Sequence, residues 1–388
     1  MRKFFLTIVL LFSSLSLSFA ENPSHLRVSL LTCSPGTSVA SAFGHSALRV
    51  CDSINNLDLI FNYGTYSFSE PNFLLKFLMG EMHYCLSVSD YKSFIRYYSE
   101  EGRSIEEQVF NLTEEQKTET YAFLLNNYKK ENRYYYYEFF LDNCATRIRD
   151  IFEGEDYSIY EEKREYTYRD EVRRSLNENR RWMLFGVNLL LGGLTDKEIS
   201  TRQMMFLPDR LSCFMEQYGN LELDEESLLL PATPVYDAPD RDKPFKEFLA
   251  KITSPEILFI LLFLAFLILY LKLGCKEKFV KIFRLVFYII LTVGGTILTF
   301  MWFGTHHIWT KANWNLLWMS PLYLVPLFFR HGKVSAIIGD VLAAVSALTL
   351  IFSWLIPQSF DIAVYFIILL EIAVALSYHQ VILQQKKD

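Results

Sequence analysis

The sequence predicts an α+β domain outside the cytoplasm, followed by an all-α transmembrane bundle of about five helices. Two patterns in the 388-residue chain support this expectation. Residues 21–229 contain stretches of alternating apolar and polar side chains, and then segments with helical periodicity. Long uninterrupted apolar runs occur only at the extreme N-terminus and after about residue 255, where they are long enough to cross a bilayer.

The first twenty residues, MRKFFLTIVLLFSSLSLSFA, have the layout of a secretory signal peptide. Arg2 and Lys3 precede an apolar core, and small residues up to Ala20 form the expected cleavage point. A first transmembrane anchor is the alternative, but the apolar core is short and the polar sequence ENPSH follows it. We therefore expect residues 1–20 to be a signal peptide and the following domain to be exported.

Four stretches of the exported domain alternate as half-buried strands do: HLRVSLLTC, HSALRVC, NLDLIFNYGTYSF and MHYCLSVSDY. They predict an antiparallel sheet. Residues 112–131 then change to helical spacing, and they open with TEEQ, a capping-box pattern. ATRIRDIFEG, from residue 145, is also helical in pattern, which makes the domain α+β. The Pro- and Asp-rich segment 230–254 is the expected linker to the membrane region.

The membrane domain is expected at 255–380, with spans at about 256–273, 285–303, 316–330, 335–356 and 361–378. Lysine and arginine flank the loop after the first span, the loop after the third span and the C-terminus, so these parts should be cytoplasmic. The loops GTHHIWTKANWN and PQSFD then lie on the outer side together with the α+β domain. This topology predicts a multi-pass membrane protein whose α+β domain lies outside the cytoplasm. Asp340 and Glu371 fall within spans, where ionisable side chains are costly and often functional.

Charge and cysteine content exclude some functions. The formal net charge of −6 argues against nucleic acid as the main partner. Six cysteines occur at irregular spacings without a CxxC pair, so a structural zinc site is not expected. Five of them precede the membrane region, where disulfides can form, but an odd number leaves at least one free thiol in a monomer.

Cys144, in LDNCATRIRD, is the candidate nucleophile. Asp142 or Asn143 is a natural N-cap, so Cys144 falls in the first turn of a helix, where the dipole stabilises a thiolate. Arg147 and Arg149 add positive charge nearby, and Asn143 is also a candidate contact for substrate. The alternatives are an ordinary buried thiol and one half of a disulfide.

A nucleophilic thiol needs a base, and His45 in SAFGHSALRV is the candidate. Gly44 allows close backbone approach, and the following strand would hold the imidazole rigidly. Asn62 in FNYGTY is our choice for a third group, because its amide can accept the imidazole N–H, and His83 is the rival. Arg49 shares the His45 face of the strand, where it would contact a phosphate or simply form a surface ion pair.

The outer loop gathers further polar candidates, namely His306, His307, Asn313 and Asn315, beside two tryptophans. Anchoring at the membrane interface explains the tryptophans. The histidines and asparagines are candidates for binding a lipid headgroup or a substrate amine. The histidine pair has no evident third ligand, so we do not expect a metal there. The aromatic run RYYYYEFF (133–140) is either a platform for acyl chains or a mixture of core and rim.

Six of these segments together resemble the Bacteroidota lipoprotein N-acyltransferase family (Lnb): SLLTCSPG, AFGHSALRV, FNYGTY, YYYYEFFLDNCATRIRD, LTDKEISTRQMMFLPDRL and THHIWTKANWNLLWMSPLYL. The resemblance covers nearly the whole mature chain. It implies a circularly permuted papain-like fold for residues 21–229, in which the histidine strand precedes the nucleophile helix. The order of His45 and Cys144 in this chain agrees with that arrangement.

The resemblance also implies an activity. Cys144 would take an acyl chain from a membrane phospholipid as a thioester and pass it to the α-amine of a diacylglyceryl-cysteine lipoprotein. His45 would move the protons, and N–H groups at the start of the Cys144 helix would stabilise the oxyanion. No metal, nucleotide or other cofactor is required.

Two other functions remain as alternatives. A membrane-anchored, papain-like cell-wall peptidase or amidase would use the same Cys144–His45 pair, but it leaves five spans and a polar outer loop unexplained. A non-catalytic membrane receptor or transport component would make Cys144 merely structural.

Overall fold

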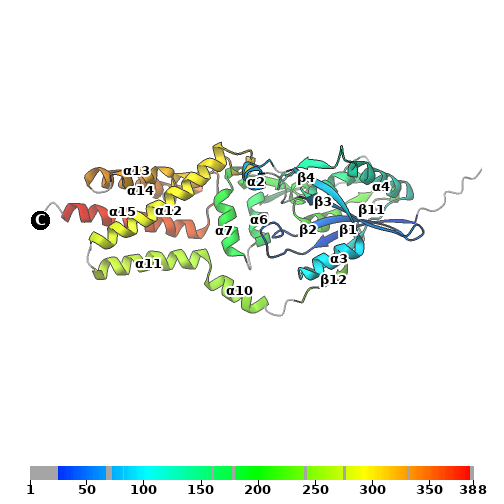
Figure 1. Cartoon of the computed structure of the whole chain (residues 1–388), viewed down its shortest axis with the longest axis horizontal. Coiled ribbons are helices and arrows are strands. Elements are labelled where there is room, and N and C mark those ends of the chain that lie inside the picture. The colour runs from blue at the N-terminus through cyan, green and yellow to red at the C-terminus, as the bar shows by residue number, and fades with distance from the viewer. Residues whose placement is uncertain are drawn as a thin grey trace, which may run out of the picture.

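The computed structural model describes residues 25–384, apart from 67–71, 82, 155, 159–160, 177–179, 240–242, 274–276 and 330–331. The predicted signal peptide lies outside the described residues. Figure 1 shows an α/β domain at one end of the molecule and a helical bundle at the other. This division matches the predicted α+β domain followed by a transmembrane bundle.

A seven-stranded sheet forms the centre of the α/β domain. Its order is β12-β5-β1-β2-β3-β4-β6, and each neighbouring pair is antiparallel. The strands are β1 (Leu26–Cys33), β2 (His45–Asp52), β3 (Leu57–Thr65), β4 (His83–Asp90), β5 (Ile105–Val109), β6 (Tyr134–Tyr136) and β12 (Thr233–Tyr236). The four stretches with alternating patterns form β1 to β4, which confirms the predicted antiparallel sheet.

Helices cover both faces of this sheet. One face packs against α4 (Glu114–Tyr128), α5 (Cys144–Arg149) and α9 (Pro208–Met215), and the other against α3 (Tyr91–Glu100). Because side chains alternate along a strand, Leu48 of β2 joins the first core and Ala47 the second. The TEEQ pattern forms the capping box expected of it, with Thr113 and Gln116 bonding reciprocally at the start of α4.

The rest of the domain is built from short elements. The helices are α2 (Phe73–Met79), α6 (Tyr168–Leu176), α7 (Arg181–Leu190), α8 (Thr201–Met204) and the 3₁₀ turns η1 (Asp150–Phe152), η2 (Gly193–Asp196) and η3 (Leu221–Leu223). One small sheet contains β7 (Tyr157–Ser158), β10 (Gly219–Asn220) and β11 (Glu226–Ser227). A second small sheet contains β8 (Lys163–Thr167) and β9 (Glu198–Ser200). The segment predicted as a linker instead adds β12 to the sheet and then forms α10 (Lys243–Ile252).

Four long apolar helices form the bundle. They are α11 (Pro255–Leu273), α12 (Glu277–Phe303), α14 (Lys333–Ile351) and α15 (Ile362–Gln384), and one candidate span begins already within α10, at Glu247. The bundle packs around Tyr288, Trp318 and other buried side chains. Four of the five predicted spans therefore correspond to helices long and apolar enough to cross a membrane.

The segment predicted as the third span, residues 316–330, is not one continuous helix, which corrects that expectation. It contains η5 (Trp314–Leu317), η6 (Pro321–Tyr323) and the five-residue helix α13 (Leu324–Phe328). Its prolines cannot donate the backbone bonds of a regular helix. The segment nevertheless runs along α12, with η6 against Gly295 and Tyr323 against Tyr288. Because 3₁₀ turns rise ~2.0 Å per residue, such a segment covers more length than an α-helix of equal residue count.

The two ionisable residues predicted inside spans both have polar partners. Glu371 is fully buried in α15, and it accepts hydrogen bonds from Tyr323 and from Ser346. Asp340 of α14 lies 2.6 Å from His379 of α15, joining the same two helices nearer their other ends. These contacts connect separate helices, as is usual for polar side chains in a bundle core.

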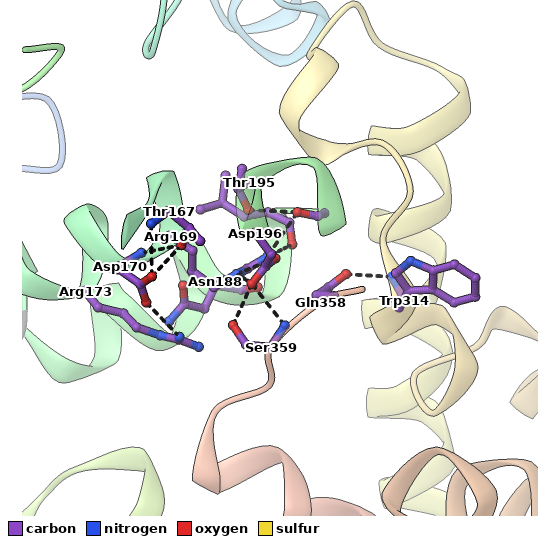
Figure 2. Close-up of polar contacts among 12 residues, drawn as sticks. Thr167, Arg169, Asp170, Arg173, Asn188, Thr195, Asp196, Trp314, Gln358 and Ser359 are labelled. Atoms are coloured by element: carbon purple, nitrogen blue, oxygen red, sulfur yellow. Dashed lines mark hydrogen bonds and ion pairs between the residues drawn. The ribbon is translucent and has the colours of Figure 1, made fainter. Parts of the chain in front are cut away.

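A polar junction joins the α/β domain to the bundle (Figure 2). Arg169 of α6 is fully buried, and it donates to the Asp196 carboxylate at 3.0 Å and to three backbone carbonyls at and just beyond the end of α7. Asp196 in turn accepts the backbone N–H and hydroxyl of Ser359, just before α15, at 3.0 and 2.6 Å. Asn188 of α7 donates to Asp361 at 3.0 Å. The loop predicted to face outward thus contacts the α/β domain.

Arg169 should contribute strongly to stability at this junction. Arg169→Met would leave Asp196 without its charged partner and three backbone carbonyls without this donor, and breaking a buried ion pair costs about 3–5 kcal/mol. We expect an apparent Tm lower by roughly 5–15 °C, measured by thermal scanning of the detergent-solubilised protein. Arg164→Met is the matched control, because the Arg164–Glu162 pair is far more accessible to solvent than Arg169 and should contribute little. Equal shifts in the two variants would contradict the prediction.

Candidate active site

The side chain of Asn143 fixes Cys144 as the first residue of α5. Asn143 Oδ1 accepts the N–H groups of Ala145 at 2.8 Å and Thr146 at 2.9 Å, and the Thr146 hydroxyl accepts the N–H of Asn143 at 2.7 Å. Asn143 Nδ2 donates to two backbone carbonyls at 2.6 and 2.9 Å. The predicted N-cap is present, and these internal bonds give Asn143 a structural role. Its contact with substrate stays a prediction.

His45 begins β2 and lies beside Cys144, with Asn62 of β3 on its other side. His45 Nε2 is 2.6 Å from Asn62 Oδ1. Because an amide oxygen only accepts, Nε2 donates this bond and Nδ1 remains for the thiol. Cys144 and His45 form a hydrogen bond. Gly44 has φ +84°, and a β-carbon there would lie only 2.9 Å from the carbonyl oxygen of Cys33, so the close approach requires glycine.

The electrostatics of the pair favour its charged form. Burial alone would raise the pKa of the Cys144 thiol and lower that of His45. The opposite charge and hydrogen bond that each group offers the other outweigh burial. The net effect lowers the pKa of Cys144 below its ordinary value of 9.0 and raises the pKa of His45 above 6.5. N–H groups of Ser46 and Ala145 also stabilise the thiolate.

Two neighbours of this pair were not identified from the sequence. Tyr98 of α3 stacks on His45 with ring centroids 6.0 Å apart, and Cys33 of β1 lies opposite His45 in the sheet. Burial raises the pKa of Cys33 to about 12, so it stays a neutral thiol at physiological pH. The register of β1 with β2 would have identified Cys33 as a neighbour of His45. The sequence pattern of a single strand does not specify which residues it pairs with in the next strand, so this register was not predicted.

The other predicted residues of the sheet have different surroundings. Arg49 is buried, and its guanidinium binds the carboxylates of Asp58 at 2.8 Å and Glu107 at 3.0 Å. These bonds favour the ion-pair alternative over contact with a phosphate. His83 packs edge-on against the ring of Tyr136 at the edge of the sheet, and Asn62 rather than His83 is hydrogen-bonded to His45.

The outer-loop histidines lie over the turn after α2. The backbone N–H of His306 donates to Met79 at 2.9 Å, and its ring lies 3.1 Å from Glu81 while remaining mostly exposed. The ring of His307 covers Gly80, within 3.3 Å of where a β-carbon would stand. The loop therefore docks on the α/β domain, and His306 keeps an accessible side chain.

Asn313 and Asn315 have a structural role in the loop, and their part in substrate binding stays a prediction. Both are buried. Asn313 Nδ2 donates to the carbonyls of Leu189 and Leu190 at 2.8 and 3.0 Å, and Asn315 Nδ2 donates to that of Leu189 at 3.1 Å. They therefore bind carbonyls at the C-terminal end of α7 that have no partner within the helix. The sequence did not indicate that this helix end lies beside the outer loop.

The aromatic run at 133–140 divides into core and rim. Tyr134 and Tyr136 are exposed, whereas Tyr135 and Phe140 are buried. Phe140 packs on Trp309 of the outer loop with ring centroids 4.9 Å apart. Because Phe140 lies four residues before Cys144, this contact connects the candidate site directly to the membrane half.

Comparison with family models agrees with both halves of this description. Residues 20–174 match the model of the Lnb N-terminal periplasmic domain, and residues 247–387 match that of the Lnb transmembrane domain. The chain belongs to the Lnb family. The first match contains Cys144, His45 and Asn62, and the Lnb transmembrane match contains the four long helices. Comparisons with curated proteins and with solved structures gave no match.

The reactivity of Cys144 should depend on His45. His45→Ala removes the opposite charge but leaves the thiol buried, so the pKa of Cys144 should rise. Because each pKa unit changes the thiolate fraction about tenfold, we expect alkylation by iodoacetamide at pH 7 to fall roughly 10–100-fold. Peptide mass spectrometry between pH 5 and 10 measures the rate. The exposed Cys213 in the same samples is the internal control. An identical pH profile for Cys144 in both proteins would contradict the assignment.

Proposed function

We propose that this protein is a lipoprotein N-acyltransferase of the cytoplasmic membrane, with several membrane-crossing segments and its α/β domain on the periplasmic face. One observation carries the proposal: a cysteine at a helix start, hydrogen-bonded to a histidine that an asparagine orients, in a chain of the Lnb family. Membership of this family suggests the activity, and the residues supply the chemistry.

The position of the site relative to the bundle supports a lipid substrate. The contact between Phe140 and Trp309 and the junction at Arg169 hold the candidate site beside the outer loops. An ester in the outer leaflet is then within reach of a side chain on the α/β domain. His306, exposed on the same loop, is a candidate contact for a headgroup.

In the first half-reaction the Cys144 thiolate attacks a phospholipid ester carbonyl. The ester C–O bond breaks, the acyl group becomes a thioester on Cys144, and His45 protonates the departing lysophospholipid oxygen. Asn62 keeps the imidazole oriented and accepts its second N–H.

In the second half-reaction the α-amine of a diacylglyceryl-cysteine lipoprotein attacks the thioester. His45 takes the proton that the amine loses, an amide bond forms, and the Cys144 thiolate leaves. The starting charge state of the pair is restored, and the product is a triacylated lipoprotein. A thioester suits this step because an amine attacks it more readily than an oxygen ester.

Substitution of the nucleophile tests the proposal. We expect Cys144→Ala to abolish N-acylation of a diacylated lipoprotein in phospholipid vesicles, read by mass spectrometry of the lipoprotein N-terminus. In the wild type without acceptor, a long-chain acyl group should accumulate on Cys144 and be released by neutral hydroxylamine. Cys213→Ala, at an exposed thiol, should behave like wild type.

Two outcomes would count against the proposal. Full N-acylation by Cys144→Ala would show that this thiol is not the acyl carrier. Cleavage of muropeptides by the wild type, lost in Cys144→Ala and without any acyl transfer, would favour the peptidase alternative.

A further inference from the structure

The proposed acyl transfer requires hydrogen-bond donors for a developing negative oxygen. Each half-reaction passes through a tetrahedral intermediate on Cys144, whose oxyanion needs preorganised donors. The start of α5 has fewer unpaired N–H donors than the sequence suggested. Asn143 Oδ1 already accepts the N–H groups of Ala145 and Thr146. The N–H of Cys144 itself is the helix donor that this cap leaves unshared. The N–H groups of Ser46 and Ala145 that stabilise the thiolate act on the sulfur, so a second donor for the oxygen is expected from another element.

Gly64 creates a space next to the nucleophile. It has φ +89° and lies where the register between β3 and β4 shifts. A β-carbon built there would lie 3.8 Å from Cys144 Cβ and 4.0 Å from Tyr135 Oη, both ordinary van der Waals distances. Since this glycine has no side chain, a small volume stays open between the nucleophile residue and a phenol hydroxyl. An oxyanion bonded through carbon to Cys144 Sγ is three bonds from Cβ and would fit in that volume.

The Tyr135 hydroxyl is suited to donate into this volume. Tyr135 is 8% exposed and lies on β6, paired with Tyr84 of β4. Within the described residues the buried hydroxyl has no hydrogen-bond partner, so neither its oxygen nor its hydrogen is engaged. Burial raises the pKa of Tyr135 far above its ordinary value, so the proton stays in place. A buried donor without an acceptor is unfavourable unless a ligand supplies one.

We infer that Tyr135 Oη donates a hydrogen bond to the oxyanion of the tetrahedral intermediate on Cys144, in the volume that Gly64 leaves open. The inference rests on the proposed acyl transfer and adds a catalytic residue to it. No proton is transferred in this contact. The bond strengthens as the carbonyl oxygen becomes negative and weakens again when the thioester forms or breaks down.

Tyr135→Phe tests the inference, because it removes the hydroxyl and keeps the ring. In the full-length protein we expect acylation of Cys144 by phospholipid vesicles, and by a p-nitrophenyl ester, to slow by about 10²–10³-fold, the usual effect of losing one oxyanion donor. Alkylation of Cys144 by iodoacetamide has no oxyanion, and its rate should stay within about twofold of wild type. Intact-protein mass spectrometry follows all three reactions.

Tyr136→Phe is the matched control, since Tyr136 is the next residue of β6 and is largely exposed. It should acylate and alkylate at wild-type rates. Acylation of Tyr135→Phe within threefold of wild type would overturn the inference. So would a parallel loss of acylation and alkylation, which would indicate that Tyr135 only supports the site. If wild-type Cys144 accepts an acyl group from the p-nitrophenyl ester but never from phospholipid, the proposed function fails while the Tyr135 comparison remains valid.

Discussion

The candidate site depends on the N-cap that Asn143 provides. One amide accepts two N–H groups of α5 and donates to two carbonyls of the chain around it. Each bond contributes about 1 kcal/mol net, but together they fix which residue begins the helix. A shift of one residue would turn Cys144 by about 100° around the helix axis, given 3.6 residues per turn, and separate its sulfur from His45. The cap therefore determines geometry more than it determines stability.

The second requirement is that the charged forms of Cys144 and His45 are stabilised although both side chains are largely buried. Desolvation opposes both charges and costs several kcal/mol per ion, and the direct contact between the two groups is what lowers the pKa of Cys144 and raises that of His45. The orienting group is an amide, Asn62. A carboxylate in its place would add a third charge and raise the pKa of His45 further, which would make it a poorer acid toward the leaving group of the proposed acyl transfer. A neutral acceptor orients the ring without that cost.

The sequence predicted the parts of this molecule that depend on local pattern. Alternation predicted β1 to β4, a cap pattern placed Cys144 at a helix start, and adjacent strands suggested the contact of His45 with Asn62. Contacts that require distant pairing were not predicted. The partners of Asn313 are carbonyls more than 120 residues earlier in the chain, and no local pattern indicates them. Tyr135 could not be distinguished from the other tyrosines of the aromatic run. Its position beside Cys144 depends on the bulge at Gly64, which no sequence pattern predicts.

The polar character of the junction has a consequence for the proposed acyl transfer. Apolar contacts at a membrane surface are weakly directional, because lipid chains compete for the same side chains. The bonds from Arg169 to Asp196, and onward to Ser359, are directional and partly buried. They specify both the height and the rotation of the α/β domain relative to the bundle. Because a phospholipid ester lies at a restricted depth in the leaflet, a nucleophile on this domain can meet it only if that height is held constant. Arg169 thus holds the α/β domain, whose sheet contains His45, in a fixed position on the apolar helices of the bundle.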